Sequence, residues 1–373
     1  MQTYDIAIIG GGIAGLSLAY FLGASRSVVV LEREENLGYH ATGRSAAEFV
    51  LRYNRPEVCK LAAISRDFFD HPPQGFSDVP LLVPRGGLMI AHAEKRERFE
   101  AHFAVEQTRT DKLTRLTVEE AIARVPILDP AYVAGAYHDP EFWDIEVESL
   151  LQGYVKGARR AGVDIRQKAG VIAARDDGRH WVLDTEGETI SAQIVVNATG
   201  GWADPTAALF GVAPIGIVPH RRTAILVDLP DGIDARTMPE INELDDEFYI
   251  KPDAGRLLVS PADETPCEPG DVQPEEIDVA WAAHHLETAT TMEVRRIAKS
   301  WAGMRSFAPD RLPVIGPDVD NPRFFWLAGQ GGYGILSSPA LGALAARLLT
   351  GGEAPEGFAR IGLAPTAFSP LRF

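Results

Sequence analysis

Short apolar runs alternate with segments of helical length at the start of the chain. Residues 4–9 form an apolar run rich in β-branched side chains, residues 13–21 follow a helical pattern, and residues 28–31 form a second apolar run. Strands that are apolar on both faces and separated by helices are typical of a parallel sheet covered on both sides. The N-terminal pattern therefore predicts a strand–helix–strand unit with Gly10-Gly11-Gly12 in its first turn.

The same alternation of short apolar runs and helical segments returns in the middle and at the end of the chain. It predicts helices at 150–161 and 335–349, and strands at 163–166, 170–174, 180–184, 194–196 and 324–327. Between these segments the pattern changes to short strands typical of antiparallel sheets, at 87–91, 133–137, 223–227, 248–251 and 256–260. The last two flank Pro252-Asp253-Ala254-Gly255, a turn sequence in which proline fixes φ and glycine accepts a positive φ. Residues 41–47 and 260–274 are predicted loops, and a helix is expected to begin at Pro274.

These elements predict an α/β fold with two kinds of domain. One is a Rossmann-like nucleotide-binding domain of discontinuous segments, and the other is an inserted α+β substrate domain with an antiparallel sheet. The length of 373 residues agrees with two to three domains of about 150 residues each. We assign residues 1–80, 145–215 and 300–373 to the nucleotide-binding domain, and residues 81–144 and 216–299 to the substrate domain.

Composition and charge exclude several classes of function. The chain has 36 Lys and Arg against 52 Asp and Glu, a formal net charge of −16, which argues against a general nucleic-acid binder. Cys59 and Cys267 form no CxxC motif, so no disulfide framework or metal site is expected and a cytoplasmic location is predicted. No apolar run approaches the roughly 20 residues of a transmembrane helix. Peripheral docking at an inner membrane surface stays open.

The first turn carries a dinucleotide-binding fingerprint. Gly10, Gly12 and Gly15 fit GxGxxG around Ile13 and Ala14, and Glu32 ends the next strand. The glycines allow backbone N–H groups to approach a pyrophosphate at a helix N-terminus, and Glu32 could accept hydrogen bonds from ribose hydroxyls. The fingerprint alone does not choose between NAD and FAD. The apolar strand ending in Ala198-Thr199-Gly200, together with Arg33, matches the pattern of two-part FAD-binding domains.

Two arginines are candidates for binding a carboxylate. Strand alternation places Arg222 on one face of its strand and Arg221 on the other, and Arg305 lies between Met304 and Phe307. A buried arginine needs an anionic partner, and two guanidinium groups can hold a carboxylate bidentately. The residues alone leave open whether each arginine binds a ligand or forms a structural ion pair.

Five segments in the same order carry a family resemblance: residues 38–47, 68–70, 248–255, 301–307 and 329–335. With them the chain resembles the D-amino acid oxidase superfamily of flavoproteins, and within it D-arginine dehydrogenase. The resemblance implies non-covalent FAD and removal of a hydride from the α-carbon of an amino acid.

It also implies site residues. Arg222 and Arg305 would hold the substrate carboxylate, Tyr53 and Tyr249 would line the pocket, and Gly332 with the following helix would stabilise negative charge on the flavin. The implied cofactor-binding residues are Gly10, Gly12, Ile13, Ala14, Gly15, Glu32, Arg33, Thr42, Gly43, Arg44, Ser45, Ala46, Val171, Ala198, Gly200, Gly303, Arg305, Gly331, Gly332, Tyr333 and Gly334.

Three positions of the substrate pocket depart from the D-arginine dehydrogenase pattern. Gly87 stands where a carboxylate would bind the substrate guanidinium, Glu48 replaces a histidine, and Asn242 replaces an apolar residue. Without a carboxylate at Gly87, desolvation of a substrate cation is not offset, so uncharged D-amino acids are expected to be better substrates than D-arginine. Glu48 either supplies the missing charge or faces solvent.

The sequence therefore predicts FAD-dependent oxidative deamination of a D-amino acid to a 2-oxo acid and ammonia. An oxidase or dehydrogenase of secondary amines or 2-hydroxy acids is the alternative within the same fold. A flavin-binding protein without turnover is a third hypothesis, and the two arginines argue against it. The sequence does not distinguish oxygen, a quinone or a carrier as the electron acceptor.

Overall fold

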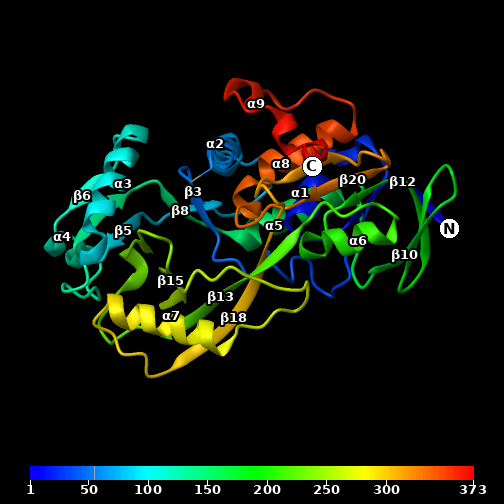
Figure 1. The fold of residues 1–373 in the computed structure, drawn as a ribbon. Coiled ribbons are helices and arrows are strands. Elements are labelled where there is room, and N and C mark those ends of the chain that lie inside the picture. Colours follow the sequence, from blue (N-terminus) through cyan, green and yellow to red (C-terminus); the bar gives the residue numbers. More distant parts are fainter. Residues whose placement is uncertain (54) are drawn as a thin grey trace.

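The computed structural model describes residues 1–53 and 55–373. Its first sheet has eight strands in the order β10-β11-β12-β1-β2-β9, with β20 beside β12 and β19 beside β20. These strands are β1 (Gln2–Ile9), β2 (Val28–Leu31), β9 (Asp164–Arg166), β10 (Val171–Asp176), β11 (Trp181–Thr185), β12 (Thr189–Asn197), β19 (Val314–Pro317) and β20 (Phe324–Ala328). The central strand β1 pairs in parallel with both β2 and β12, so the beginning, middle and end of the chain meet in one sheet (Figure 1).

Helices cover this first sheet on both faces. On one face α1 (Ile13–Leu22) packs between α5 (Val147–Arg160) and α8 (Gly334–Leu349), and α2 (Pro56–Asp70) packs against α8. On the other face α6 (Ala203–Leu209) packs over a second apolar cluster. Both faces of the sheet are therefore buried, which explains why β2 is apolar at every position.

The second sheet has nine strands in the order β17-β13-β16-β15-β14-β5-β7-β6, with β18 beside β13. They are β5 (Gly87–Ala91), β6 (Thr114–Leu116), β7 (Gly135–Asp139), β13 (Val218–Asp228), β14 (Glu240–Glu243), β15 (Tyr249–Asp253), β16 (Arg256–Ser260), β17 (Thr265–Pro266) and β18 (Ile297–Phe307). All neighbours pair antiparallel except β14 and β5. Figure 1 shows α7 (Glu276–Ala289) running along β13 and β18.

One face of the nine-stranded sheet is apolar and covered, and the other is polar. The apolar face packs against α7 and α4 (Val118–Arg124) in a core that includes Ile225, Ile241 and Leu286. On the opposite face, α3 (Arg96–Arg109) packs on β5 and β7 through Phe99 and Phe103, against Ala91 and Tyr137. The polar part of that face on β13, β15 and β18 is left to line a site.

A small three-stranded sheet completes the fold. Its order is β3 (Glu48–Val50), β8 (Phe142–Ile145) and β4 (Leu82–Pro84), all antiparallel. Phe49 and Ile145 belong to the core under α1, α5 and α8. This sheet therefore ties the segment after the 41–47 loop to the first sheet's core.

The predicted α/β fold is confirmed, with some differences in the elements. The strand expected at 133–137 begins two residues later, as β7, because Tyr132 and Val133 belong to the preceding turn. The sequence missed α2, α3 and β14, and the predicted domain boundary at 300 falls within β18 of the nine-stranded sheet. No helix in the described part of the chain is long and apolar enough to cross a membrane.

Candidate active site

One cavity of about 460 Å³ lies where the two large sheets face each other. Its walls come from the turn after β1, the 38–46 loop, the end of β12, the turn before α8, and the polar face of β13, β15 and β18. Of the predicted site residues, it is lined by Gly10, Gly12, Ile13, Ala14, Glu32, Arg33, Thr42, Arg44, Ser45, Ala46, Val171, Ala198, Gly200, Arg222, Tyr249, Gly303, Arg305, Gly331, Gly332 and Gly334. Gly15, Gly43, Glu48, Tyr53, Gly87, Asn242 and Tyr333 do not line it.

Glycines close the turn between β1 and α1. Gly10 has φ +109°, and a side chain there would place Cβ 2.4 Å from the carbonyl oxygen of Ala198. A Cβ at Gly15 would lie 2.0 Å from the carbonyl oxygen of Gly10, so Gly15 acts by packing although it does not line the cavity. Gly12 caps α1 without a side-chain hydrogen bond, and the first turn of α1 has no acidic residue. Ile13 N donates to Thr42 Oγ1 at 3.1 Å, and the positive end of the helix, which the glycines leave open to close approach, suits the pyrophosphate of FAD.

Glu32 and the residues near it form the adenosine end of the cavity. The Glu32 carboxylate is fixed by backbone N–H donors, with Gly11 N at 2.7 Å from Oε2 and Glu34 N at 2.8 Å from Oε1. Carboxylate oxygens have further lone pairs, so this arrangement still allows Glu32 to accept from a ribose. The Arg33 guanidinium lies over the Trp202 ring at 5.1 Å, and both line the cavity.

The 41–47 loop joins the two walls of the cavity. Arg44 Nη1 donates to the carbonyls of Val272 and Ala302, both at 3.1 Å, and Nη2 pairs with Asp271. In the other direction Lys251 Nζ donates to the carbonyls of Ala46 and Ala47. The resemblance implies that Arg44 contacts the flavin. Arg44 does line the cavity, but its guanidinium already binds Ala302 on β18 and the predicted 260–274 loop.

Register explains the roles of the adjacent arginines Arg221 and Arg222. Arg221 points to the covered face, where it pairs with Glu275 at 2.6 Å and Asp278 at 3.0 Å. Arg222 is opposite Gly303 on β18 and points into the cavity, as does Arg305 two residues further along that strand. The sequence left open whether Arg222 and Arg305 each bind a ligand or form a structural ion pair. Both line the cavity, and Arg222 also contacts Glu264, whereas the adjacent Arg221 forms structural ion pairs on the covered face.

The electrostatics of Arg222 suit an anionic ligand. Its side chain is 13% exposed. In the described part of the chain its one ion pair is with Glu264 at 3.3 Å, and Glu264 also pairs with Arg311 at 2.9 Å. Among the described residues Arg222 Nε has no hydrogen-bond partner. Burial and the neighbouring Arg305 lower the pKa of Arg222, although a guanidinium stays charged at any ordinary pH. A ligand carboxylate between these two arginines would offset their repulsion.

The turn before α8 brings a helix N-terminus to the cavity beside Arg305. Gly331 has φ +54°, and a Cβ there would lie 2.1 Å from the Phe307 ring. A Cβ at Gly332 would lie 3.2 Å from the Arg305 guanidinium, so glycine lets this backbone approach the arginine. The 16-residue helix α8 begins at Gly334 and has no acidic residue in its first turn. Its positive end therefore suits negative charge on a bound cofactor.

Tyr249 and Tyr53 differ in position. Tyr249 lies on the polar face of β15 and lines the cavity. Tyr53 lies outside the lining, and its ring centroid is 5.5 Å from that of Tyr333. Burial and the Glu48 carboxylate raise the pKa of Tyr53, while Arg305 lowers it.

The structure adds one residue that sequence reasoning missed. Glu240 on β14 is in register with Gly87 on β5 and two residues before Asn242, so all three positions share the polar face. A side chain at Gly87 is blocked, because its Cβ would lie 2.8 Å from the Phe142 ring. Glu240 is 2% exposed, and burial together with the Glu48 carboxylate raises the pKa of Glu240 well above its usual range. The alternation Glu240-Ile241-Asn242 was the available signal.

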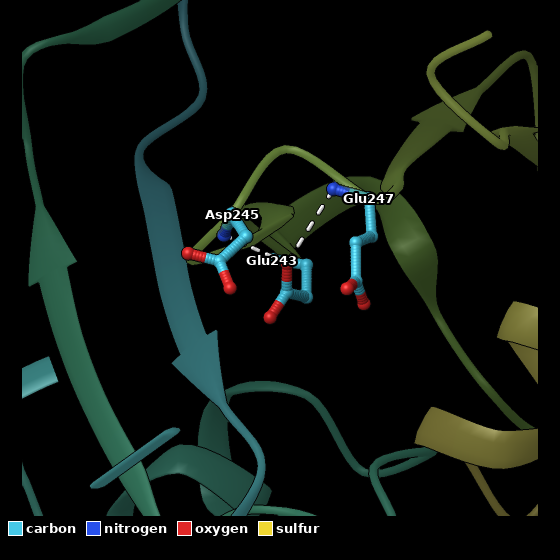
Figure 2. A group of neighbouring side chains, drawn as sticks. All are labelled: Glu243, Asp245 and Glu247. Atoms are coloured by element: carbon cyan, nitrogen blue, oxygen red, sulfur yellow. Dashed lines mark hydrogen bonds between the residues drawn. The ribbon is translucent and has the colours of Figure 1, made fainter. Parts of the chain in front are cut away.

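A separate acidic cluster lies at the end of β14. Figure 2 shows the backbone N–H groups of Asp245 and Glu247 directed at the Glu243 carboxylate, at 2.7 and 3.4 Å. Lys95 Nζ contacts all three carboxylates, at 2.7, 3.1 and 2.9 Å for Glu243, Asp245 and Glu247. Because an ammonium group already occupies this cluster, it serves to anchor the β14–β15 loop.

Comparisons with known proteins agree with this geometry. The family model described as "FAD dependent oxidoreductase" (DAO) matches residues 5–348. Glycine oxidase from Geobacillus kaustophilus (strain HTA426) is 27% identical over 363 residues, which cover 93% of each chain. Mitochondrial dimethylglycine dehydrogenase from Rattus norvegicus is 25% identical over 94% of this chain and 43% of its own. A crystal structure of glycine oxidase from Geobacillus kaustophilus superposes with a TM-score of 0.82 and 25% identity, covering 98% of this chain and 99% of that one. These relatives support the superfamily and do not point specifically to D-arginine dehydrogenase.

Proposed function

The chain belongs to the DAO family of FAD-dependent oxidoreductases, and from this premise we propose that it oxidatively deaminates a free D-amino acid. The observation that carries the proposal is the pair Arg222 and Arg305, two arginines that face the FAD cavity from adjacent strands. Such a pair binds a carboxylate strongly, because charge-assisted bidentate hydrogen bonds form away from bulk water.

The residues around the cavity fit FAD from end to end. The N-terminus of α1 would hold the pyrophosphate, Glu32 the ribose, and the Gly331–Gly332 turn with α8 the flavin. When bound, FAD supplies the acceptor for a hydride. We expect the purified protein to be yellow and to release FAD on acid denaturation. Flavin that stays with the precipitate would contradict non-covalent binding.

The protein's part in the proposed reaction is positional. Arg222 and Arg305 would fix the substrate carboxylate, and Tyr249 would limit the orientations open to the α-carbon. Loss of a hydride from the α-carbon of the neutral amine leaves an imino acid, which water hydrolyses to the 2-oxo acid and ammonia. No general base is required of a side chain, because a bound amine can lose its proton before the hydride leaves.

A substrate panel tests the proposal against its alternative. We would add D-amino acids, glycine, N-methylated amines and 2-hydroxy acids anaerobically to the holoenzyme and follow bleaching of the flavin. Bleaching by D-amino acids and release of ammonia are expected. Bleaching only by N-methylated amines would favour the alternative, which the similarity to dimethylglycine dehydrogenase supports. Bleaching by none of these compounds would contradict both.

The electron acceptor and the location need separate experiments. Turnover in an oxygen electrode chamber, compared with turnover on a quinone analogue or a dye, would distinguish an oxidase from a dehydrogenase. The cytoplasmic location rests on cysteine usage and stays a prediction that cell fractionation tests.

A further inference from the structure

We propose that Glu264 competes with the substrate carboxylate for Arg222, and that Arg311 limits this competition by pairing with Glu264. The inference rests on the proposed function, because it needs a substrate carboxylate at Arg222. It deepens that function by naming two residues that set the affinity for the carboxylate. Neither Glu264 nor Arg311 lines the cavity, so both act through Arg222, which does line it.

The chain on either side of Glu264 fixes this residue opposite Arg222. Glu264 lies between β16 and β17, next to Asp263 and Thr265. The Asp263 carboxylate accepts hydrogen bonds from the backbone N–H and the hydroxyl of Thr223, at 2.6 and 3.1 Å. Thr265 is the register partner of the residue before Arg222 in the ladder of β13 and β17. Glu264 is therefore opposite Arg222, and opposite residues of an antiparallel pair point to the same side.

The Glu264 carboxylate is shared unequally between two arginines. Both of its oxygens lie 2.9 Å from Arg311 Nη2, whereas only Oε1 contacts Arg222, at 3.3 Å from Nη2. Charge-assisted hydrogen bonds are usually about 2.7–2.9 Å long, so the contact with Arg222 is the weaker one. Arg311 therefore holds Glu264, and the contact with Arg222 is the one that a ligand can replace.

Arg311 is a fixed anchor for Glu264. Its guanidinium lies over the Phe307 ring at 3.7 Å, and its backbone N–H donates to the carbonyl of Ala308 at 2.8 Å. Arg372 holds the same turn through Asp310, at 2.6 Å. Arg311 has φ +63°, a conformation that favours glycine and that other residues keep only where their surroundings hold them. The turn therefore presents the Arg311 side chain to Glu264 in one place.

A ligand carboxylate and Glu264 need the same nitrogen of Arg222. A guanidinium has two pairs of nitrogens that bind a carboxylate bidentately, Nε with Nη2 and Nη1 with Nη2. Nη2 belongs to both pairs, and it is the atom that Glu264 contacts. Before a substrate binds, Glu264 gives the buried Arg222 an anionic partner. When a carboxylate replaces it there, Glu264 keeps its two contacts with Arg311, so no charge is left without a partner.

The two residues should therefore change carboxylate affinity in opposite directions. Glu264→Gln removes the competing charge, so Arg222 should bind a carboxylate more tightly. Arg311→Gly removes the partner of Glu264, which then pairs more strongly with Arg222 and weakens ligand binding. Glycine suits the positive φ at this position, so the turn is kept. If Glu264 served only to orient Arg222, Glu264→Gln would weaken binding instead.

Isothermal titration calorimetry of the FAD-loaded enzyme with hexanoate tests these signs. We expect the Kd to fall about threefold in Glu264→Gln and to rise about threefold in Arg311→Gly, since partly exposed ion pairs have modest effects. The Kd of the double variant should match that of Glu264→Gln, because Arg311 acts through Glu264. Glu268→Gln is the matched control, because it removes the same charge from an exposed position of the same loop and should leave the Kd unchanged. If Arg311→Gly does not fold, Arg311→Lys replaces it, because an ammonium group cannot keep the geometry of the guanidinium.

Any other order of Kd values overturns the inference. Such outcomes are a higher Kd in Glu264→Gln, no rise in Arg311→Gly, or an effect of Arg311→Gly that is as large in the Glu264→Gln background as in the parent. If the Kd is equal in all variants while the parent turns over D-norleucine, the inference fails and the proposed function stands. The expected order supports the inference even if no D-amino acid bleaches the flavin. If no variant and not the parent binds hexanoate, Arg222 is not a carboxylate site and the inference fails.

Discussion

The two ends of the cavity are built by different means. The cofactor end consists largely of backbone and glycine, with Gly10, Gly15 and Gly331 placed where a Cβ would collide with a neighbour. The substrate end consists of side chains, with Arg222, Arg305 and Tyr249 brought together from separate strands of one sheet. Backbone sites depend on the absence of side chains, whereas side-chain sites depend on charge and register. Substitutions at the cofactor end should therefore reduce FAD occupancy, whereas substitutions at the substrate end should reduce kcat/KM.

The largest effect is expected at the cofactor end. In Gly15→Ala the added Cβ would lie 2.0 Å from the carbonyl oxygen of Gly10, so the turn that receives the pyrophosphate cannot keep its shape. We expect FAD occupancy, measured as flavin absorbance per protein, to fall to near zero. Gly187→Ala is the control, because its Cβ would meet no atom within 4 Å. Normal occupancy in Gly15→Ala would show that the backbone of this turn is not the cofactor site.

At the substrate end, loss of a charge should spare the cofactor. Arg222→Met or Arg305→Met should weaken transition-state binding by about 3 kcal/mol and so lower kcat/KM roughly 100-fold, because a desolvated carboxylate loses charge-assisted hydrogen bonds. FAD occupancy should stay near that of the parent. The assigned carboxylate site is wrong if both variants turn over substrate like the parent.

The neighbouring arginine sharpens the comparison within one strand. Arg221 pairs with Glu275 and Asp278 on the covered face, so Arg221→Met removes a structural ion pair. We expect the free energy of unfolding to fall by about 2–3 kcal/mol, with kcat/KM of the folded enzyme nearly unchanged. Denaturant titration and steady-state kinetics on the same preparation would measure both. A large loss of kcat/KM at full stability would contradict the division of roles.

The smallest effect concerns pH and Glu240. Burial, and then Glu48, raise the pKa of Glu240 well above its usual range, while Lys251 lowers it and Asp144 raises it. The native state then binds this proton more tightly than the unfolded state. The proton on Glu240 therefore adds to the free energy of unfolding below the pKa of an unfolded glutamate, about 4.3. This contribution is lost as the pH rises through the folded pKa of Glu240, by up to about 1.4 kcal/mol per pH unit. Relative to Glu240→Gln, the parent should lose stability from pH 5 to pH 9 in denaturant titrations. Parallel curves would contradict a retained proton.

Local patterns made much of the cofactor end predictable. The turn from Gly10 to Gly15, the apolar strand before Glu32 and the helix after Gly334 are each encoded within a few residues, and all three appear where expected. The hairpin of β15 and β16 was predictable for the same reason, because its turn sequence is local.

Long-range pairings were not predictable from one sequence. Glu240 gains its neighbours because the four-residue strand β14 pairs with β5, about 150 positions earlier in the chain, and no local pattern specifies that partner. Arg44 was assigned to the flavin by resemblance, and its contact with Asp271 also joins distant segments. Alternation did separate Arg221 from Arg222, since this depends only on strand period.

The reciprocal bonds at the 41–47 loop limit how this enzyme could evolve a new specificity. Arg44 reaches from the loop to Ala302, and Lys251 reaches back to the carbonyls of Ala46 and Ala47, so one short segment sets the spacing of both walls. An insertion or deletion in this loop would move the cofactor cradle and the substrate wall together. New substrates are therefore more accessible through exchanges of side chains on the polar face of β13, β15 and β18, which leave that spacing intact.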